Sequence, residues 1–131
     1  MVARKASLTD RDYRQLLSLR SSLRQFLHWS EEKARDAGLT PAQHQLLLAI
    51  RGHDGATPPT VGDLADHLLL RHHSAVGLVD RAEEAGLVRR TRDKADRRVV
   101  HVALTAKGSR VLASLSADHL EEIRRLGFLP L

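Results

Sequence analysis

Residues 60–104 read TVGDLADHLLLRHHSAVGLVDRAEEAGLVRRTRDKADRRVVHVAL. Up to Gly86, the apolar residues recur at the three- and four-residue spacing of amphipathic helices. This spacing predicts two short helices, over 60–69 and 72–85, that are joined by a tight turn. Gly86 is the predicted stop of the second helix.

After Gly86 the stretch changes to strand-like character. Segments 87–92 and 99–104 are rich in β-prone residues, and the segment between them, 94–98, is short, polar and mostly charged. The pattern predicts a two-stranded hairpin with a basic tip.

Three more helices are predicted around this stretch, so that the fold class is mainly α with a small β-hairpin, in the order α-α-α-α-β-β-α. Gly127 and Pro130 are expected to end the last of them. Apolar spacing places these helices at 8–37, 41–51 and 105–126, and the turn-rich loop 52–59 joins the second to the quoted stretch.

The basic charge of the chain is concentrated in one region. The net charge is +5, and residues 71–110 hold ten Lys or Arg against five Asp or Glu, whereas the remainder holds eleven of each. A basic surface suits nucleic acid, membranes or acidic proteins. Two short helices and a basic hairpin favour nucleic acid, because they are the parts of a winged helix-turn-helix. In that arrangement one helix enters the major groove of DNA and the hairpin reaches the minor groove or the backbone.

Several function classes find no support in the residues. The chain has no cysteine, which excludes disulfides, thiolate zinc sites and redox sensing through sulfur. No apolar run of membrane-spanning length and no signal-peptide pattern behind Met1–Lys5 occur, so we expect a cytoplasmic protein without a membrane partner. Because nucleophile motifs, glycine-rich phosphate loops and metal triads are also missing, we expect neither an enzyme nor a cofactor.

Several motifs in one order resemble the multiple antibiotic resistance regulator (MarR) family. The motifs are LADHL (64–68), VDR (79–81), EAGLVRR (84–90), DRR (96–98) and LTAKG (104–108), and the likeness runs from about residue 40 to 110 without gaps. The resemblance implies a homodimeric winged helix-turn-helix transcription regulator with a pseudo-palindromic double-stranded DNA operator as partner. Members of this family often repress transcription and often release DNA when a small aromatic or phenolic compound binds.

The resemblance also implies how the chain is organised. Residues 1–131 are expected to form one MarR-like domain, in which helices 8–38 and 105–127 dimerise and residues 40–104 form the DNA-binding lobe. Relatives usually continue into a further C-terminal helix, whereas segment 126–131 (LGFLPL) is too short for one. The terminal helices still carry more apolar residues than one small domain readily buries, so we expect a homodimer.

In the hairpin, the resemblance assigns Asp96 and Arg98 to a pair that holds the wing together and places an arginine in the minor groove. A guanidinium is drawn to the negative potential of a narrow minor groove, and a nearby carboxylate orients it. Arg98 is therefore the predicted main contact. The other basic side chains are interpreted as phosphate neutralisers, which add affinity without sequence choice, namely Arg90, Arg92, Lys94 and Arg97. The alternative is a solvated charged hairpin.

The helix predicted at 72–85 is the candidate recognition helix. Three positions near it depart from the family pattern. Leu69 stands where glycine commonly makes the turn, Arg71 where a capping residue is usual, and Gly77 where an arginine often contacts bases. The residues expected to face DNA are Arg71, His72, His73, Ser74, Val76, Gly77, Asp80 and Arg81.

A ligand site is predicted between the first two helices. Phe26, Trp29 and His44 lie where this family often forms a pocket, and aromatic rings over an ionisable group suit a phenolic acid. Phe26, at helical spacing, also fits a plain core residue. One alternative function is a zinc-responsive regulator that uses His28, His44 and Glu31, although the histidine spacing lacks a metal-binding motif. Another is a winged-helix module that binds protein instead of DNA.

Overall fold

The computed structural model describes residues 7–128 and confirms the predicted order of elements. The predictions for Met1–Lys5 and Pro130 lie outside the described residues. Among the helices of residues 7–128, none combines the length and the hydropathy that a membrane crossing requires. The elements are α1 (Asp10–Asp36), α2 (Pro41–Arg51), α3 (Val61–Leu68), α4 (His72–Glu84), β1 (Val88–Arg92), β2 (Val100–Leu104) and α5 (Ala106–Leu126).

Threonine side chains start α2 and α3. At α2, Thr40 and Gln43 form a capping box, in which the backbone N–H of each residue donates to the side chain of the other at 3.0 and 3.1 Å. Thr60 and Asp63 make the same exchange at α3. Because these bonds satisfy N–H groups that have no partner inside a helix, they determine where both helices begin.

The hydrophobic core lies between α2, α3, α4 and the sheet. Burial of one leucine or valine side chain contributes about 1.5–3 kcal/mol to the free energy of folding. The largest fully buried side chains all come from these elements, which we call the lobe (residues 40–104), and they are Leu46, Leu47, Leu64, Val79, Val88 and Val102.

The base of the hairpin is fastened to the loop before α3. β1 and β2 pair antiparallel along their whole length. On the other edge of β2, His101 forms an isolated bridge with Thr60, and the N–H of Val102 donates to the carbonyl of Pro59 at 2.9 Å. The loop 52–59, predicted only as a connection, therefore holds the hairpin beside α3.

The start of α5 packs against the residues that follow α4. The hydroxyl of Thr105 donates to the carbonyl of Gly86 at 2.6 Å. A Cβ atom on Gly108 would lie 2.1 Å from the carbonyl oxygen of Leu87. Only glycine allows this close approach, which explains why a glycine lies in the first turn of α5.

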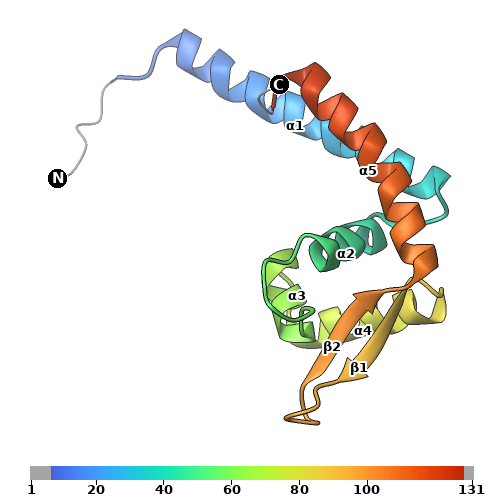
Figure 1. The fold of residues 1–131 in the computed structure, drawn as a ribbon. Coiled ribbons are helices and arrows are strands. Elements are labelled where there is room, and N and C mark those ends of the chain that lie inside the picture. Colours follow the sequence, from blue (N-terminus) through green and yellow to red (C-terminus); the bar gives the residue numbers. More distant parts are fainter. Residues whose placement is uncertain (1–6, 129–131) are drawn as a thin grey trace.

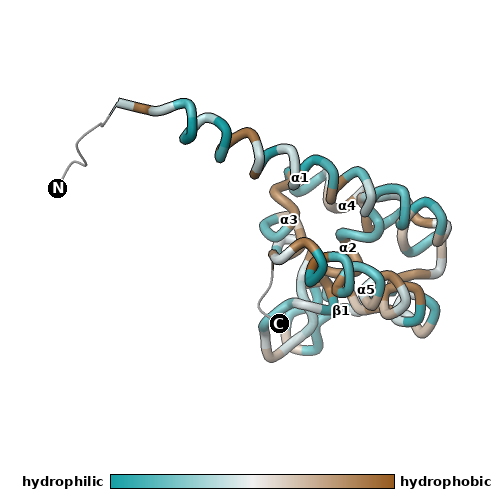
Figure 2. The backbone as a smooth tube through the Cα atoms, turned by 90° about the horizontal axis from the view of Figure 1, so that it is seen from above, coloured by the Kyte–Doolittle hydropathy of each residue, from teal (hydrophilic) through white to brown (hydrophobic). Residues whose placement is uncertain are grey.

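α1 and α5 form a pair of long helices beside the lobe (Figure 1). In Figure 2 the first half of α1 extends beyond the rest of the described chain. On α1 only Ser30 and Ala34 are buried. In the outer segment of α1 (residues 10–27), Phe26 is half-buried, but the leucines stay 43–63% exposed, namely Leu16, Leu17, Leu19, Leu23 and Leu27.

Candidate nucleic-acid interface

The turn between α3 and α4 contains a leucine in the left-handed region. Leu69 has φ 55° and ψ 42°, and its side chain is 93% exposed. A left-handed conformation costs a residue with a Cβ atom about 1–2 kcal/mol. As the sequence indicates, the helix-turn-helix is made here without the usual glycine, and the strain is kept in a residue that packs against nothing.

The start of α4 presents a free helix end. Arg71 occupies the N-cap position and makes no capping bond through its side chain. Free N–H groups at a helix start attract anions such as phosphate. Of the predicted DNA-facing residues in and before α4, Arg71, His72, His73, Asp80 and Arg81 are exposed, and Ser74, Val76 and Gly77 are half-buried.

Arg90 joins the sheet to α4. Its guanidinium forms ion pairs with Asp80 and, at 2.8 Å, with Glu83, and it also reaches the carbonyl of Val76 at 3.5 Å. Arg90 is one of the predicted phosphate contacts, and in the structure its guanidinium lies between two carboxylates of α4. The contact that the geometry supports for Arg90 is with the recognition helix, which it holds against the wing.

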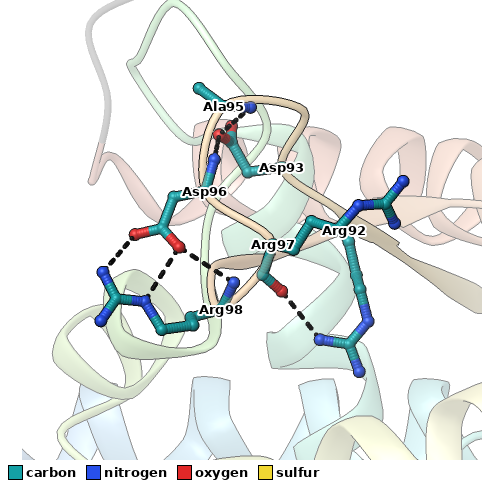
Figure 3. A network of polar contacts seen from close by, with 6 residues as sticks. All are labelled: Arg92, Asp93, Ala95, Asp96, Arg97 and Arg98. Carbon is teal, nitrogen blue, oxygen red and sulfur yellow. Dashed lines mark hydrogen bonds and ion pairs between the residues drawn. The ribbon is translucent and has the colours of Figure 1, made fainter.

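At the tip of the hairpin, the Asp96 carboxylate makes a bidentate contact with the Arg98 guanidinium (Figure 3). The Asp96 carboxylate accepts from the backbone N–H, Nε and Nη2 of Arg98 at 3.0, 3.1 and 3.1 Å. These bonds hold the pKa of the Asp96 carboxyl below its usual range and raise the pKa of Arg98. The Arg98 side chain is nevertheless 91% exposed. The guanidinium is thus oriented by a carboxylate and open to a partner.

Asp93 shapes the rest of the wing turn. Its Oδ2 accepts from the N–H groups of Ala95 and Asp96 at 3.0 and 2.9 Å, and these bonds help to lower the pKa of its carboxyl (Figure 3). On the other side of the turn, Arg92 donates to the carbonyl of Arg97 at 2.8 Å. Asp93 is not among the predicted site residues, although a single aspartate at the start of a short turn is a signal for such a motif.

The wing and α4 line a common cavity. A cavity of about 450 Å³ lies between them, and it is lined by Thr60 and Gly62 near the start of α3, His72 and Val76 of α4, and Arg98 and Val100 of the wing. Predicted recognition-helix and wing residues therefore converge on the same surface.

A second pocket lies between α1, α2 and α5. Its volume is about 330 Å³, and its walls include Phe26, Ser30, His44, His119 and Ile123. Two of the predicted ligand-site residues, Phe26 and His44, therefore line one pocket. Trp29 is not among the lining residues. Its ring packs instead against His119, at 4.8 Å between centroids, and against Phe26 at 6.0 Å.

The histidine pair in this pocket leaves one polar atom free. His119 Nδ1 donates to the carbonyl of Leu115 at 2.8 Å, and Nε2 lies 2.6 Å from the Ser30 hydroxyl oxygen. His44 lies beside it, with ring centroids 4.7 Å apart, and its buried Nδ1 has no partner within the described chain. Burial, and then the His119 ring, lower the pKa of His44. His119 is not among the predicted pocket residues, because 89 residues separate it from Ser30 along the chain.

The residues of the zinc alternative do not form a cluster. His28 pairs with Glu32 on an exposed face of α1 at 3.1 Å, whereas His44 is buried. Within residues 7–128, no three His, Cys, Asp or Glu side chains are grouped as metal ligands. The structure therefore gives the zinc-responsive alternative no support.

Known proteins whose sequences are similar to this chain are transcription regulators. The MarR family profile matches residues 37–99. An uncharacterized HTH-type transcriptional regulator of Bacillus subtilis (strain 168), YsmB, is 26% identical over 121 residues, which cover 89% of this chain and 81% of that protein. The HTH-type transcriptional repressor MdtR of the same organism is 30% identical over 77 residues, which cover 59% of this chain and 48% of that protein. The transcriptional activatory protein BadR of Rhodopseudomonas palustris is 36% identical over 86 residues, with coverages of 65% and 49%.

The fold also matches solved structures. AbsC, a MarR family transcriptional regulator from Streptomyces coelicolor, superposes with a TM-score of 0.77 at 24% identity, and the match covers 96% of this chain and 86% of AbsC. At this identity the likeness concerns the fold, and it includes the long terminal helices as well as the lobe.

Proposed function

We propose that this chain is a MarR family transcriptional regulator, as the profile match over residues 37–99 and the similarity to YsmB support, and that it binds a double-stranded, pseudo-palindromic DNA operator in a sequence-specific manner. The observation that carries the proposal is the exposed guanidinium of Arg98, which Asp96 holds at the tip of the wing. A preoriented arginine loses little conformational freedom when it enters a narrow minor groove. In this proposal the uncapped start of α4 enters the major groove on the same side.

Each proposed contact has its own role. Arg98 inserts into the minor groove, and Arg92, Lys94 and Arg97 neutralise phosphates around it. Arg90 fastens the wing to α4, because its guanidinium is engaged by Asp80 and Glu83. Arg71 and the first residues of α4 contact phosphates and base edges.

The binding unit in this proposal is a homodimer formed through α1 and α5. Two copies supply two recognition helices for the two half-sites of the operator. The exposed leucines of the outer segment of α1 support this arrangement, because a two-fold axis lets identical apolar faces cover each other. Residues 1–131 then act as one domain, in which helices 8–38 and 105–127 dimerise and residues 40–104 bind DNA.

The proposed output is repression that a small aromatic acid relieves. The pocket between α1, α2 and α5 offers the Phe26 ring and the unpartnered Nδ1 of His44, a combination that suits an aromatic ring with a hydroxyl or carboxyl group. Ligand bound between the dimer helices and the lobe changes how far apart the two recognition helices lie. Couplings of this kind commonly change affinity about 5- to 150-fold.

The test is binding to the DNA upstream of the gene for this chain across a salt series. Arg98→Ala is expected to weaken specific binding about 10- to 100-fold and to reduce the slope of log affinity against log salt by about one. Arg35→Ala, which removes the same charge from an exposed position on α1, is the matched control and is expected to leave affinity unchanged. If both variants lose the same DNA affinity, the wing contributes only non-specific electrostatic attraction. A partner affinity that does not change with salt would favour a protein-binding module.

The same assay tests the effector. Adding a hydroxybenzoate is expected to release the DNA from the native chain, and His44→Phe is expected to release it much less. A reporter gene under the same DNA distinguishes repression from activation, since deleting the regulator raises expression only if it represses. Unchanged DNA binding across a panel of small aromatic acids would contradict the proposed ligand class.

A further inference from the structure

We propose that His101 is a positioning residue that holds the wing in its DNA-binding arrangement only while both of its ring nitrogens carry protons, so that operator affinity falls as the pH rises. The proposal rests on the DNA-binding function proposed above and names a control that the family resemblance does not include. His101 is the second residue of β2 and lies between the wing turn and the loop before α3.

The two partners of the His101 ring decide its protonation. Nδ1 lies 2.7 Å from the carbonyl oxygen of Pro58, and Nε2 lies 3.0 Å from Oδ1 of Asp93. A carbonyl and a carboxylate are both acceptors, whereas a neutral imidazole has one N–H donor and one lone pair. Only the imidazolium can donate to both, so loss of one proton turns one of these hydrogen bonds into a contact between two acceptors. The His101 side chain is 12% exposed, so water replaces that bond poorly.

A continuous set of hydrogen bonds runs from His101 to the proposed DNA contact. Oδ1 of Asp93 accepts from His101, while Oδ2 accepts from the N–H groups of Ala95 and Asp96. Asp96 in turn holds the Arg98 guanidinium through two side-chain bonds (Figure 3). His101 therefore connects the loop before α3, through Asp93, to the turn that orients Arg98, although it lies outside the predicted interface.

The charged groups around His101 favour its protonated form. Asp93 faces it from the wing turn and Asp63 from the start of α3, where Asp63 also lies 3.8 Å from His53. His53 is in turn hydrogen-bonded to His67 at the same edge of the lobe. The pKa of His101 is raised, first by its bond to Asp93 and next by the Pro58 carbonyl, with a further contribution from the charge of Asp63. The pKa of Asp93 is lowered, so this carboxylate stays ionised while His101 titrates.

The sign of the effect follows from linkage. A histidine whose pKa is higher in the folded chain stabilises the fold fully at a pH below its unfolded pKa, and this contribution disappears as the pH rises through the folded value. The wing is therefore held at a pH below the folded pKa of His101 and is released as the pH rises through it. Loss of one hydrogen bond in this range corresponds to about a three- to ten-fold loss of operator affinity.

The experiment compares operator affinity at pH 6.0 and pH 8.5 for the native chain, His101→Gln and the matched control His28→Gln. Glutamine does not titrate and cannot replace the two protonated ring nitrogens of His101. The ratio of the affinity at pH 6.0 to that at pH 8.5 is therefore expected to be about three- to ten-fold smaller in His101→Gln than in the native chain. His28 lies on an exposed face of α1, and its variant is expected to keep the native ratio. Equal ratios in the native chain and His101→Gln would overturn the proposal, because the pH dependence would then come from other histidines such as His72 and His73.

A second measurement uses the native chain without DNA. The ring nitrogens of His101 and the backbone N–H signals of Asp96 and Arg98 are followed by NMR through a pH titration. The proposal is supported if both ring nitrogens are protonated at pH 6 and the His101 and wing signals titrate with the same midpoint. It is overturned if the ring is neutral at pH 6, or if the wing signals do not change as His101 titrates. If the signals titrate together while no DNA binds at any pH, the proposed DNA-binding function fails and the coupling of His101 to the wing still stands.

Discussion

The lobe and the outer segment of α1 use the same apolar residue types in opposite ways. In the lobe, leucines such as Leu47 and Leu64 are fully buried among side chains of the same chain. In the outer segment of α1, Leu16 and Leu23 follow an equally regular helical spacing but remain exposed. Helical periodicity therefore identifies an apolar face without telling which partner covers it. For the lobe the partner is the chain itself, and for α1 we propose a second copy.

Truncating a leucine in the lobe is the change with the largest expected effect on stability. Leu64→Ala removes a fully buried side chain of α3, and a core truncation of this kind costs about 2–5 kcal/mol of the free energy of unfolding. Chemical denaturation at two protein concentrations measures it, and the loss is expected at both. A loss below about 1 kcal/mol would mean that the lobe core is looser than its burial indicates.

A charge on the outer segment of α1 is expected to act on assembly and to leave the core of the lobe intact. Leu16→Asp places an unpaired carboxylate on the proposed dimer face, and burying such a group costs several kcal/mol. We therefore expect self-association to weaken at least about tenfold, as measured by sedimentation velocity, with an unchanged far-ultraviolet spectrum of the lobe. Ser18→Asp, also exposed on α1, is the control with the same added charge off that face. Identical self-association of both variants would show that this face is not the interface.

The smallest effect on stability is expected at the turn of the helix-turn-helix, where the substitution should stabilise the protein. Leu69→Gly removes the strain of a left-handed leucine that buries nothing, but glycine has more conformational freedom to lose on folding. The balance of about 1–2 kcal/mol against about 0.5–1 kcal/mol predicts a gain of about 0–1.5 kcal/mol in the free energy of unfolding. Thermal unfolding measures the gain, and Leu69→Ala, which keeps the Cβ strain, is expected to show none. A destabilised Leu69→Gly variant would mean that the leucine makes a stabilising contact.

Features that depend on neighbouring residues were predictable from the sequence. The starts of α2 and α3 follow from Thr40 with Gln43 and Thr60 with Asp63, because a capping box closes within one helical turn. The pairing of Asp96 with Arg98 involves residues two positions apart, and the family resemblance already implied it. These features are local, so packing elsewhere in the chain had little influence on them.

Contacts between distant elements were not predictable. Arg90 was interpreted as a phosphate contact, but packing of β1 against α4 brings it to Asp80 and Glu83. Trp29 was assigned to the pocket wall, but it lies behind the wall and packs against the lining residue His119. In both cases residue type was informative about chemistry, while the side chain's partner depended on how two elements pack.

The sequence by itself determined the order of helices and strands and the basic hairpin, because periodicity, caps and turns act over a few residues. Its resemblance to the MarR family implied the pairing of Asp96 with Arg98. Only the tertiary structure decided that Pro58 and Asp93 both face His101, and that Ser30 bonds His119 beside the unpartnered nitrogen of His44. These groups lie far apart along the chain or on different elements. Burial of the core sets their distances, and no pattern of neighbouring residues encodes that packing.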